Sequence, residues 1–399
     1  MSAVEQSGTG PAWSAAPGEF HNPVTVHFGA GCWREAGRTS EAARLLLLTT
    51  PGMVRRGTAR AVQAGWGGGG AFIVCDRVAS HPELSALTEL ARELRGAPYD
   101  GLVALGGGSV IDTAKILSVL LADPSLDLAA LLRADGAARI KRTLPVHALP
   151  TTAGTGSEVT PFATVWNRAS GEKHSLNAPG LFPRTAWVDP TLTRGAPFAV
   201  AAASGLDALS QALESVWSLR ANRTTIGHAL HGFGLALAAL PRLKGSRDDP
   251  EILRDLAQAS LSAGLAISHT RTALAHSMSY PLTARFGLPH GLACSFTLPA
   301  VLEFNAGADD GRLAHTAAVA GCGSIAGLRD RLVAVLDAVD MDGLLRAHAI
   351  DGARLQAVAS EMIHPGRADN NLRPAGLAEV RGILAATGRY LPACRESHA

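Results

Sequence analysis

The first half of the chain repeats one pattern, in which a short continuous apolar run is followed by a segment with helical periodicity. The apolar runs stand at 24–29, 45–50, 71–76, 101–107 and 144–150. Between them lie segments such as PELSALTELAREL, with a proline near a helix start. Strands that are buried on both faces show no polar alternation, so this pattern is typical of a parallel sheet covered by helices. We therefore predict an α/β domain of the dinucleotide-binding type.

The second half of the chain has a different pattern. The strand-like runs end at TAWVDPTLTRGAPF, where Pro190 and Pro197 bracket a linker-like segment. Helical periodicity is then nearly unbroken from about residue 199 to residue 280, and it resumes after residue 298. We predict a flexible extension over 1–18, an α/β domain over 19–194 and an all-helical domain over 195–399.

Composition restricts the partners and the compartment. The chain has 36 basic and 34 acidic residues, a balance that argues against nucleic acid or an anionic membrane as a partner. Its five cysteines are scattered and contain no CxxC pair, which indicates a reducing compartment. No apolar run approaches membrane-spanning length, and the N-terminus lacks a signal-peptide pattern. We expect a cytoplasmic protein that forms a homo-oligomer, with a dimer as the first expectation.

Two glycine-rich loops follow neighbouring apolar runs. GGGSVIDTAK, over 106–115, opens a helix, and glycines there let backbone amides approach an anion at the helix N-terminus. The alternative is that these glycines relieve crowding and that Ser109 is only an N-cap, with Asp112 completing the capping pattern. PTTAGTGSE, over 150–158, adds small hydroxyl residues that could reach a pyrophosphate or a ribose. Two such loops at one sheet edge favour a dinucleotide cleft.

The stretch HSMSYPLTARFGLPHG, over 276–291, supplies two histidines around a predicted helix end. Pro281 should end the helix near Tyr280, which places His276 and Tyr280 on one face. The following turn could return His290 to the same point in space. The alternative is that each histidine is an ordinary core residue with its hydrogen bonds satisfied.

A second pair of polar residues stands one turn apart on the apolar helix GLDALSQALES. Asp207 and Gln211 are expensive to bury there without a partner, and a cation would supply one. Together with His276 and His290 they offer two oxygens and two nitrogens. This donor set suits Fe²⁺ or Zn²⁺ and is poor for copper or calcium.

The ordered motifs GGGS, PTTAGTGSE, D-x3-Q and H-x13-H resemble the iron-containing (group III) alcohol dehydrogenase family. The resemblance covers nearly the whole chain from about residue 20, and it implies the dehydroquinate synthase-like fold with an all-helical second domain. It also implies Asp207, His276 and His290 as metal ligands. Gln211 stands where the family has a histidine ligand, and Tyr280 stands where most relatives have histidine. SQALES, SYPLT and FGLPHG are most similar to the phosphonoacetaldehyde reductase branch.

The resemblance also implies how a nicotinamide cofactor is held. Thr50 stands where NAD-preferring relatives often carry an aspartate, so NADP stays possible beside NAD. Arg55 and Arg56 either bind the 2′-phosphate of NADP or are ordinary solvated residues. Lys173 is placed near the nicotinamide ribose, with a surface lysine as the alternative. The candidate cofactor residues are Thr50, Gly107, Gly108, Ser109, Asp112, Thr151, Thr152, Thr155, Ser157 and Lys173.

These residues predict a metal-dependent, NAD(P)H-linked reduction of a small anionic aldehyde. The resemblance implies phosphonoacetaldehyde, reduced to 2-hydroxyethylphosphonate, as an example of such a substrate. The candidate catalytic residues are His276 and Tyr280. Tyr280 would give the proton to the alkoxide, unless it is only a packed helix-end tyrosine. Arginines suit an oxyanion, so the substrate candidates are Arg285, His364, Arg367 and Asn370, with Arg373 nearby.

Three other functions stay open at this point. A maleylacetate reductase-like enzyme or a general alcohol dehydrogenase would use the same residues. A lyase of the dehydroquinate synthase type would turn NADH over only transiently and would need further basic residues. A catalytically silent binding protein is the third, because Gln211 replaces a histidine ligand.

Overall fold

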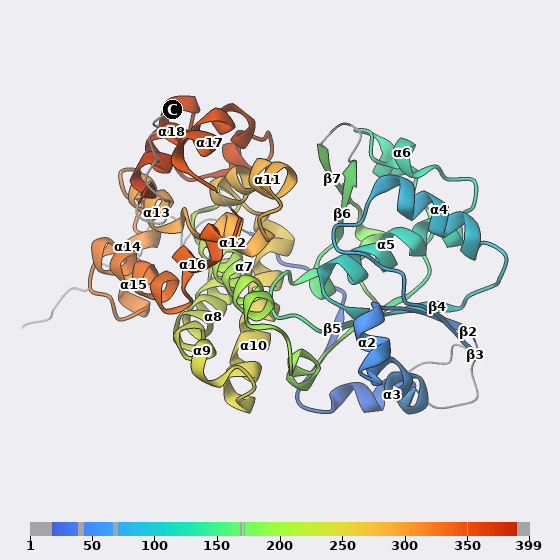
Figure 1. Cartoon of the computed structure of the whole chain (residues 1–399). Coiled ribbons are helices and arrows are strands. Elements are labelled where there is room, and N and C mark those ends of the chain that lie inside the picture. The colour runs from blue at the N-terminus through green and yellow to red at the C-terminus, as the bar shows by residue number, and fades with distance from the viewer. Residues whose placement is uncertain are drawn as a thin grey trace, which may run out of the picture.

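The computed structural model describes residues 18–38, 44–66, 71–167, 170, 172–348 and 350–388. The extension predicted over 1–18 therefore lies, except for its last residue, outside the described residues. Figure 1 shows a sheet-containing half in blue to green beside a helical half in yellow-green to red. Among the described helices, none is both long enough and apolar enough to cross a lipid bilayer.

Six parallel strands form the main sheet, in the order β1-β8-β5-β4-β2-β3. Their bounds are β1 (Thr25–Phe28), β2 (Arg44–Leu48), β3 (Ala71–Cys75), β4 (Gly101–Gly106), β5 (Val146–Pro150) and β8 (Thr185–Val188). The parallel sheet predicted from the apolar runs is confirmed. The strand order reverses between β2 and β4, and the crevice at the carboxyl ends of such strands is where α/β sheets bind ligands.

The β2 strand explains why the apolar runs are continuous. Leu46 and Leu48 lie in one buried cluster, with side chains of α4 (Leu84–Leu94) and α5 (Gly108–Ala122). Leu45 and Leu47 lie in a second cluster with α3 (Thr58–Gly65). Successive side chains of a strand point to opposite faces, so a strand covered on both faces needs an apolar residue at every position.

A two-stranded antiparallel hairpin was not predicted. It consists of β6 (Phe162–Asn167) and β7 (Glu172–Asn177), and it follows the PTTAGTGSE loop. The sequence EKHSLN of β7 is polar and carries no long apolar run, which hid the strand. In Figure 1 the hairpin stands at the edge of the sheet half that faces α11.

The rest of the chain is helical, as predicted. The sheet half also contains α2 (Pro51–Arg55) and α6 (Leu128–Leu131). The helical half contains α7 (Phe198–Trp217), α8 (Arg223–Ala239), α9 (Leu243–Ser246), α10 (Pro250–Thr270), α11 (Leu274–Phe286), α12 (His290–Ser295), α13 (Leu298–Ala306), α14 (Arg312–Val319), α15 (Ile325–Ala338), α16 (Met341–Arg346), α17 (Gly352–Ala357) and α18 (Leu377–Ala386).

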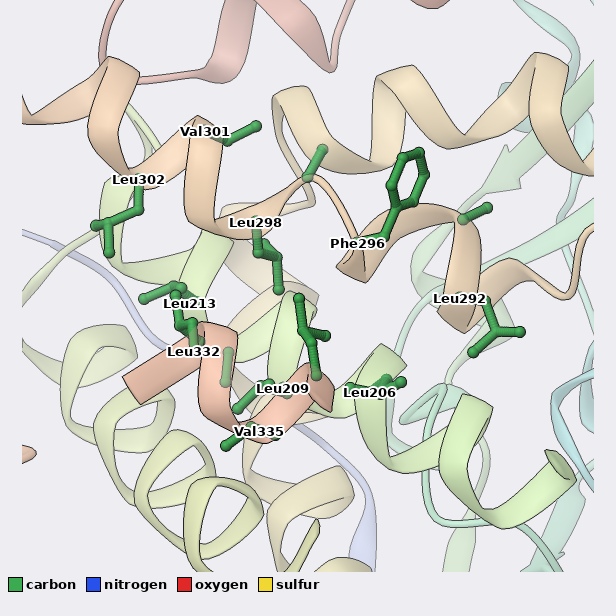
Figure 2. Close-up of a cluster of buried hydrophobic side chains, with 14 of the residues drawn as sticks. Leu206, Leu209, Leu213, Leu292, Phe296, Leu298, Val301, Leu302, Leu332 and Val335 are labelled. Carbon is green, nitrogen blue, oxygen red and sulfur yellow. The ribbon is translucent and has the colours of Figure 1, made fainter. Parts of the chain in front are cut away.

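Helix α7 lies in the centre of the helical core. Figure 2 shows Leu209 and Leu213 of α7 beside Leu332 and Val335 of α15, in one buried cluster with Phe296. Fourteen of the twenty residues of α7 are buried. A helix in this position is rigid, because each buried aliphatic side chain contributes about 1.5–3 kcal/mol by leaving water.

Helix α11 does not end near Tyr280, so that part of the prediction was wrong. It continues through Pro281 to Phe286 and is closed by Gly287, whose φ of 64° is the left-handed conformation favoured at helix ends. Pro281 removes one backbone hydrogen bond. Pro281 and Leu282 are both buried in the helical half, and this tertiary packing outweighs the local preference of proline.

Candidate active site

A cavity of about 420 Å³ lies between the two halves. Its walls on the sheet side include Gly108, Ser109, Asp112, Thr155, Ser157 and Lys173. Its walls on the helical side include Asp207, Gln211, His276, Tyr280, His290 and Arg367. The structure thus brings most of the predicted cofactor residues and all four predicted metal donors to one place.

The two glycine-rich loops meet at the carboxyl ends of β4 and β5. A Cβ on Gly108 would lie 2.6 Å from Cγ2 of Thr155, and one on Gly107 would lie 2.9 Å from Oγ1 of Thr152. Gly107, and not Ser109, is the N-cap of α5. The Ser109 hydroxyl accepts a hydrogen bond from the backbone N–H of His81 at 3.2 Å. The loops therefore need glycine for their contact, and the N-terminus of α5 faces the cavity.

The PTTAGTGSE loop also touches the helical half. A Cβ on Gly156, whose φ is 59°, would lie 2.4 Å from Cα of Gly264 in α10. A Cβ on Gly154 would lie 2.7 Å from the carbonyl oxygen of Ser204 in α7. Contacts this short exclude any side chain at either loop position. The loop is thereby fixed against the helix that carries the proposed metal donors Asp207 and Gln211.

Asp112 and Lys115 hold this loop in place through hydrogen bonds. The Asp112 carboxylate accepts hydrogen bonds from the Ser157 hydroxyl at 2.5 Å and from the Thr164 N–H at 2.8 Å. The Lys115 ammonium is fully buried and donates to the Ser157 hydroxyl and to the Phe162 carbonyl, both at 2.9 Å. Burial lowers the pKa of Lys115 to about 8, although Asp112 opposes this. Lys115 was missed because a lysine in a helical pattern normally predicts a solvated position.

Four predicted cofactor residues do not line the main cavity. Thr50 is the N-cap residue of α2, at the end of β2. Gly107 lies behind Gly108 against Thr152. Thr151 and Thr152 line a second, small cavity against α7. Their roles in cofactor binding stay predictions.

Glu158 makes the loop sensitive to pH. Burial raises the pKa of its carboxyl from 4.5 to about 6, although Lys115 acts in the opposite direction. The folded state then binds more protons than the unfolded state between pH 4.5 and 6, so this contribution to stability is present below 4.5 and lost as the pH rises through 6. Above pH 6 the free energy of unfolding of Glu158→Gln should be about 2 kcal/mol higher than that of wild type, because glutamine carries no charge to bury. Near pH 4.5 the two proteins should be equally stable.

Urea unfolding of both proteins between pH 4.5 and 8 tests this expectation. The matched control is Glu303→Gln, because Glu303 is 63% exposed and should unfold like wild type. A Glu158→Gln protein that is less stable than wild type at pH 7 would contradict it.

The four predicted metal donors come from three helices that pack closely. Asp207 and Gln211 lie one turn apart on α7, while His276 lies on α11 and His290 begins α12. Gly291 explains how α12 approaches α7. A Cβ at this position would lie 1.8 Å from the carbonyl oxygen of Ala203 and 3.1 Å from Cβ of Asp207. The glycine after His290 thus lets the start of α12 lie directly against the helix that carries Asp207.

The donors converge as the sequence predicted. Oδ1 of Asp207 lies 3.3 Å from Nε2 of His276, and the rings of His276 and His290 are 5.2 Å apart. The side-chain oxygen of Gln211 is buried and has no hydrogen-bond partner among the described residues. A buried acceptor without a donor is costly. The arrangement fits a divalent cation, because a cation at this point would give the Gln211 oxygen the partner that it lacks.

Two further residues at this point were missed by the sequence analysis. Sγ of Cys294 lies 3.8 Å from Oδ1 of Asp207, and Asp207, His276 and Cys294 bring possible ligand atoms within 4.8 Å of one another. Glu214 is fully buried, and its carboxylate lies 2.6 Å from Nδ1 of His276. Glu214 thereby leaves Nε2 of His276 for the cation. Its position two turns after Asp207 on the same apolar helix was the available signal.

The surroundings of His276 and His290 shift the pKa values of these two histidines in opposite directions. Burial works against protonation of His276, but Cys294, Glu214 and Asp207 raise its pKa well above the ordinary value. Burial, Lys173 and His276 lower the pKa of His290 well below it. The lowered pKa of His290 favours the neutral imidazole, which is the form that binds a metal. Burial would raise the pKa of Asp207, but its hydrogen bond with His276 and the nearby His290 lower it.

Tyr280 faces the sheet half across the cavity. The Lys173 ammonium of β7 lies 4.1 Å from its ring centroid, and Nε of Arg367 donates a hydrogen bond to its hydroxyl at 3.2 Å. Burial would raise the pKa of Tyr280, but Lys173, Arg367 and His276 lower it to about 8. The His364 ring packs edge-on against Tyr280 at 5.0 Å. Lys173 is thus a cavity residue, not one of the outer surface.

Two substrate predictions were wrong. Arg285 is 58% exposed and forms an ion pair with Glu361 at 2.8 Å, away from the cavity. Asn370 is buried, and its amide donates to the carbonyl oxygens of Thr270 and Thr272. Asn370 thus fixes the backbone at Thr270 and Thr272 and does not line the cavity. Arg373, named with it, lies against Phe304.

The comparisons with known proteins agree with this geometry. A family model described as iron-containing alcohol dehydrogenase matches residues 23–190, and a model of the C-terminal part of that family matches residues 201–388. The chain belongs to the iron-containing alcohol dehydrogenase family. This confirms the family resemblance. Solved structures similar to this chain include an iron-containing alcohol dehydrogenase, which agrees with the predicted fold of a sheet domain followed by a helical domain.

Relatives within the iron-containing alcohol dehydrogenase family are of more than one kind. A probable alcohol dehydrogenase, EutG, from Escherichia coli (strain K12) is 36% identical over 56% of this chain and 56% of its own length. A phosphonoacetaldehyde reductase from Streptomyces viridochromogenes is 36% identical over 65% of this chain and 66% of its own length. The chain thus spans between half and two thirds of these two relatives.

A solved structure matches over more of its length. The sulfoacetaldehyde reductase from Bifidobacterium kashiwanohense, in complex with NAD⁺, has a TM-score of 0.87 and 28% identity. The match covers 94% of this chain and 99% of that one. This neighbour is named as a reductase and the two curated relatives as a dehydrogenase and a reductase, so the named relatives are oxidoreductases.

Proposed function

We propose that this protein uses a divalent metal and NAD(P)H to reduce a small anionic aldehyde, with phosphonoacetaldehyde, reduced to 2-hydroxyethylphosphonate, as the leading candidate. One observation carries the proposal. The cavity that gathers the metal donors also contains Lys173 and Arg367, and among the described residues neither forms an ion pair with a carboxylate. Cations that are not held in an ion pair favour an anionic ligand.

The metal-holding residues of the proposal are Asp207, Gln211, His276 and His290, with Cys294 close by. When bound, Fe²⁺ or Zn²⁺ would polarise the carbonyl group, and the nicotinamide would supply the hydride. The chain provides orientation. Glu214 fixes the His276 ring, and the loops 106–109 and 150–158 would place the cofactor phosphates at the N-terminus of α5.

Tyr280 is the proposed proton donor. Its hydroxyl oxygen already accepts a hydrogen bond from Arg367, so the hydroxyl hydrogen is left to point elsewhere. Tyr280 and His290 both line the cavity, and their rings stack with centroids 6.4 Å apart. A donor in this position can deliver its proton to the oxygen of the reduced carbonyl group.

The names of two similar proteins support the substrate class. One is a phosphonoacetaldehyde reductase and the other a sulfoacetaldehyde reductase. Both names denote two-carbon aldehydes that carry a charged acid group. The EutG relative carries no such indication in its name, so the substrate class has to be measured.

Steady-state kinetics with a panel of aldehydes test the proposal. We expect kcat/KM for phosphonoacetaldehyde to exceed that for propionaldehyde by about 100-fold, because only the anion uses the cavity cations. NADPH and NADH are compared in the same assay. Equal values for charged and neutral aldehydes would reject the anionic substrate class and favour a general alcohol dehydrogenase.

A further inference from the structure

Arg271 has the most unusual backbone in the cavity wall. It follows the last residue of α10, and its φ of 58° with ψ of 177° lies in a region that only glycine adopts easily. An arginine in this conformation costs free energy that a glycine would not. Such strain persists where the rest of the structure imposes it, and it is concentrated at ligand sites.

The strained backbone is held from both sides. The Asn370 amide donates to the carbonyl oxygen of Thr270 at 2.8 Å and to that of Thr272 at 3.0 Å, so it bridges the residues before and after Arg271. The Ser218 hydroxyl donates a further hydrogen bond to Thr270 at 3.0 Å. These hydrogen bonds fix the backbone on both sides of Arg271, and so they fix the direction in which its side chain points.

The Arg271 side chain lines the main cavity. Among the described residues no carboxylate forms an ion pair with it. Burial and the neighbouring charges of Arg220 and Arg367 lower its pKa, which indicates that cations and not anions surround it. Among the described residues, none of Lys173, Arg271 and Arg367 forms an ion pair with a carboxylate.

We propose that Arg271 is the specificity-determining residue of this enzyme, binding the acid group of the substrate together with Arg367 and Lys173. This inference rests on the proposed function and narrows it to tetrahedral oxyanions, namely phosphonates or sulfonates. The three cations come from three separate elements, the end of α10, the segment after residue 363 and β7. Three donors from three separate elements can each meet one of three oxygens that do not share a plane, whereas a planar carboxylate offers only two.

The test uses Arg271→Gly in the full-length, metal-loaded enzyme. Glycine removes the guanidinium and also relieves the backbone strain, so the melting temperature should be equal to or higher than that of wild type. The ratio of kcat/KM for phosphonoacetaldehyde to kcat/KM for propionaldehyde should fall about 10- to 100-fold. Arg271→Lys should retain part of this ratio, because it keeps the charge without the planar fork.

Binding measurements complete the experiment. Calorimetry with 2-hydroxyethylphosphonate in the presence of NADH should show a similar loss of affinity, while the affinity for NADH stays unchanged. The control is Arg285→Ala, which removes an exposed arginine outside the cavity and should leave every value as in wild type. Succinic semialdehyde, a carboxylate, should react more slowly than phosphonoacetaldehyde in wild type.

The outcomes separate this inference from the proposed function. If wild type does not prefer charged aldehydes at all, the proposed substrate class fails. If wild type prefers them and Arg271→Gly keeps the same ratio, only the role of Arg271 is overturned. A loss of NADH affinity without a change in the ratio would assign Arg271 to the cofactor and would also overturn it.

Discussion

Replacing Glu214 by alanine is expected to destabilise the protein by about 3–5 kcal/mol, because it leaves several buried donors without an acceptor. The Glu214 carboxylate accepts hydrogen bonds from the N–H groups of Ala273, Ala275 and His276, and it also binds the His276 ring. It thus caps the N-terminus of α11 and orients a proposed metal ligand through the same two oxygens. A helix N-terminus favours a negative charge in this position.

Because the alanine variant can fail to fold, Glu214→Gln is the informative change. Glutamine keeps one acceptor but points an N–H₂ group at backbone N–H groups, so we expect a smaller loss of stability. Metal affinity should fall about 10- to 100-fold, as is typical when the partner of a metal-bound histidine is removed. Urea unfolding and competition with a chelator measure the two effects. Glu251→Gln, on an exposed glutamate of α10, is the control. Wild-type metal affinity in Glu214→Gln would contradict the assignment.

Removing the metal and changing Gln211 should act in opposite directions on stability. With metal at 100 to 1,000 times its dissociation constant, a chelator should lower the stability of wild type by about 2.7–4.1 kcal/mol and abolish aldehyde reduction. In chelator, Gln211→Leu should be more stable than wild type by about 1–3 kcal/mol, because it removes a buried oxygen that has no partner. With metal, the variant should lose this advantage, since it offers one ligand fewer.

Replacing Gln211 by histidine should increase the metal affinity. Gln211→His should bind Fe²⁺ or Zn²⁺ more tightly than wild type, because imidazole is a better donor than an amide oxygen. Metal content after dialysis and thermal unfolding with and without metal measure both variants. If Gln211→Leu binds metal as wild type does, Gln211 is not a ligand, and Cys294 is the next candidate for the fourth position.

The parts of the fold set by local patterns could be predicted from the sequence. Continuous apolar runs predicted five strands of the sheet, because a strand buried on both faces has no other composition. The convergence of Asp207, Gln211, His276 and His290 was also predictable, since polar residues one turn apart on apolar helices need a partner. The β6–β7 hairpin was not predictable, because β7 is mostly polar and carries no apolar run that would indicate a strand.

One wrong assumption produced a second error. Expecting α11 to stop before Pro281 left Arg285 in a turn that could fold back to the cavity. The helix continues, and at 3.6 residues per turn the nine positions from His276 to Arg285 place them on opposite faces. Arg285 therefore faces Glu361 and solvent. Whether a proline ends a helix depended on the burial of Leu282, which is a property of the tertiary fold.

The roles of Glu214, Asn370 and Arg271 that were missed depend on contacts between distant segments. Glu214 binds residues about sixty positions away, and Asn370 binds the backbone beside Arg271 from 98–100 positions away. No pattern along the chain indicates that Arg271 has a positive φ, since arginine is a normal helix-end residue. A role that comes from hydrogen bonds between distant segments is found only in the structure.

The contact between Gly156 and Gly264 limits how this chain can be recombined with its relatives. An exchange of whole halves near residue 195 would join a loop from one protein to helices from another. A single Cβ on either side of that contact would prevent the loop and α10 from seating. A hybrid of this chain and a relative should therefore fold only if glycine stands on both sides of the contact between the loop over 150–158 and α10.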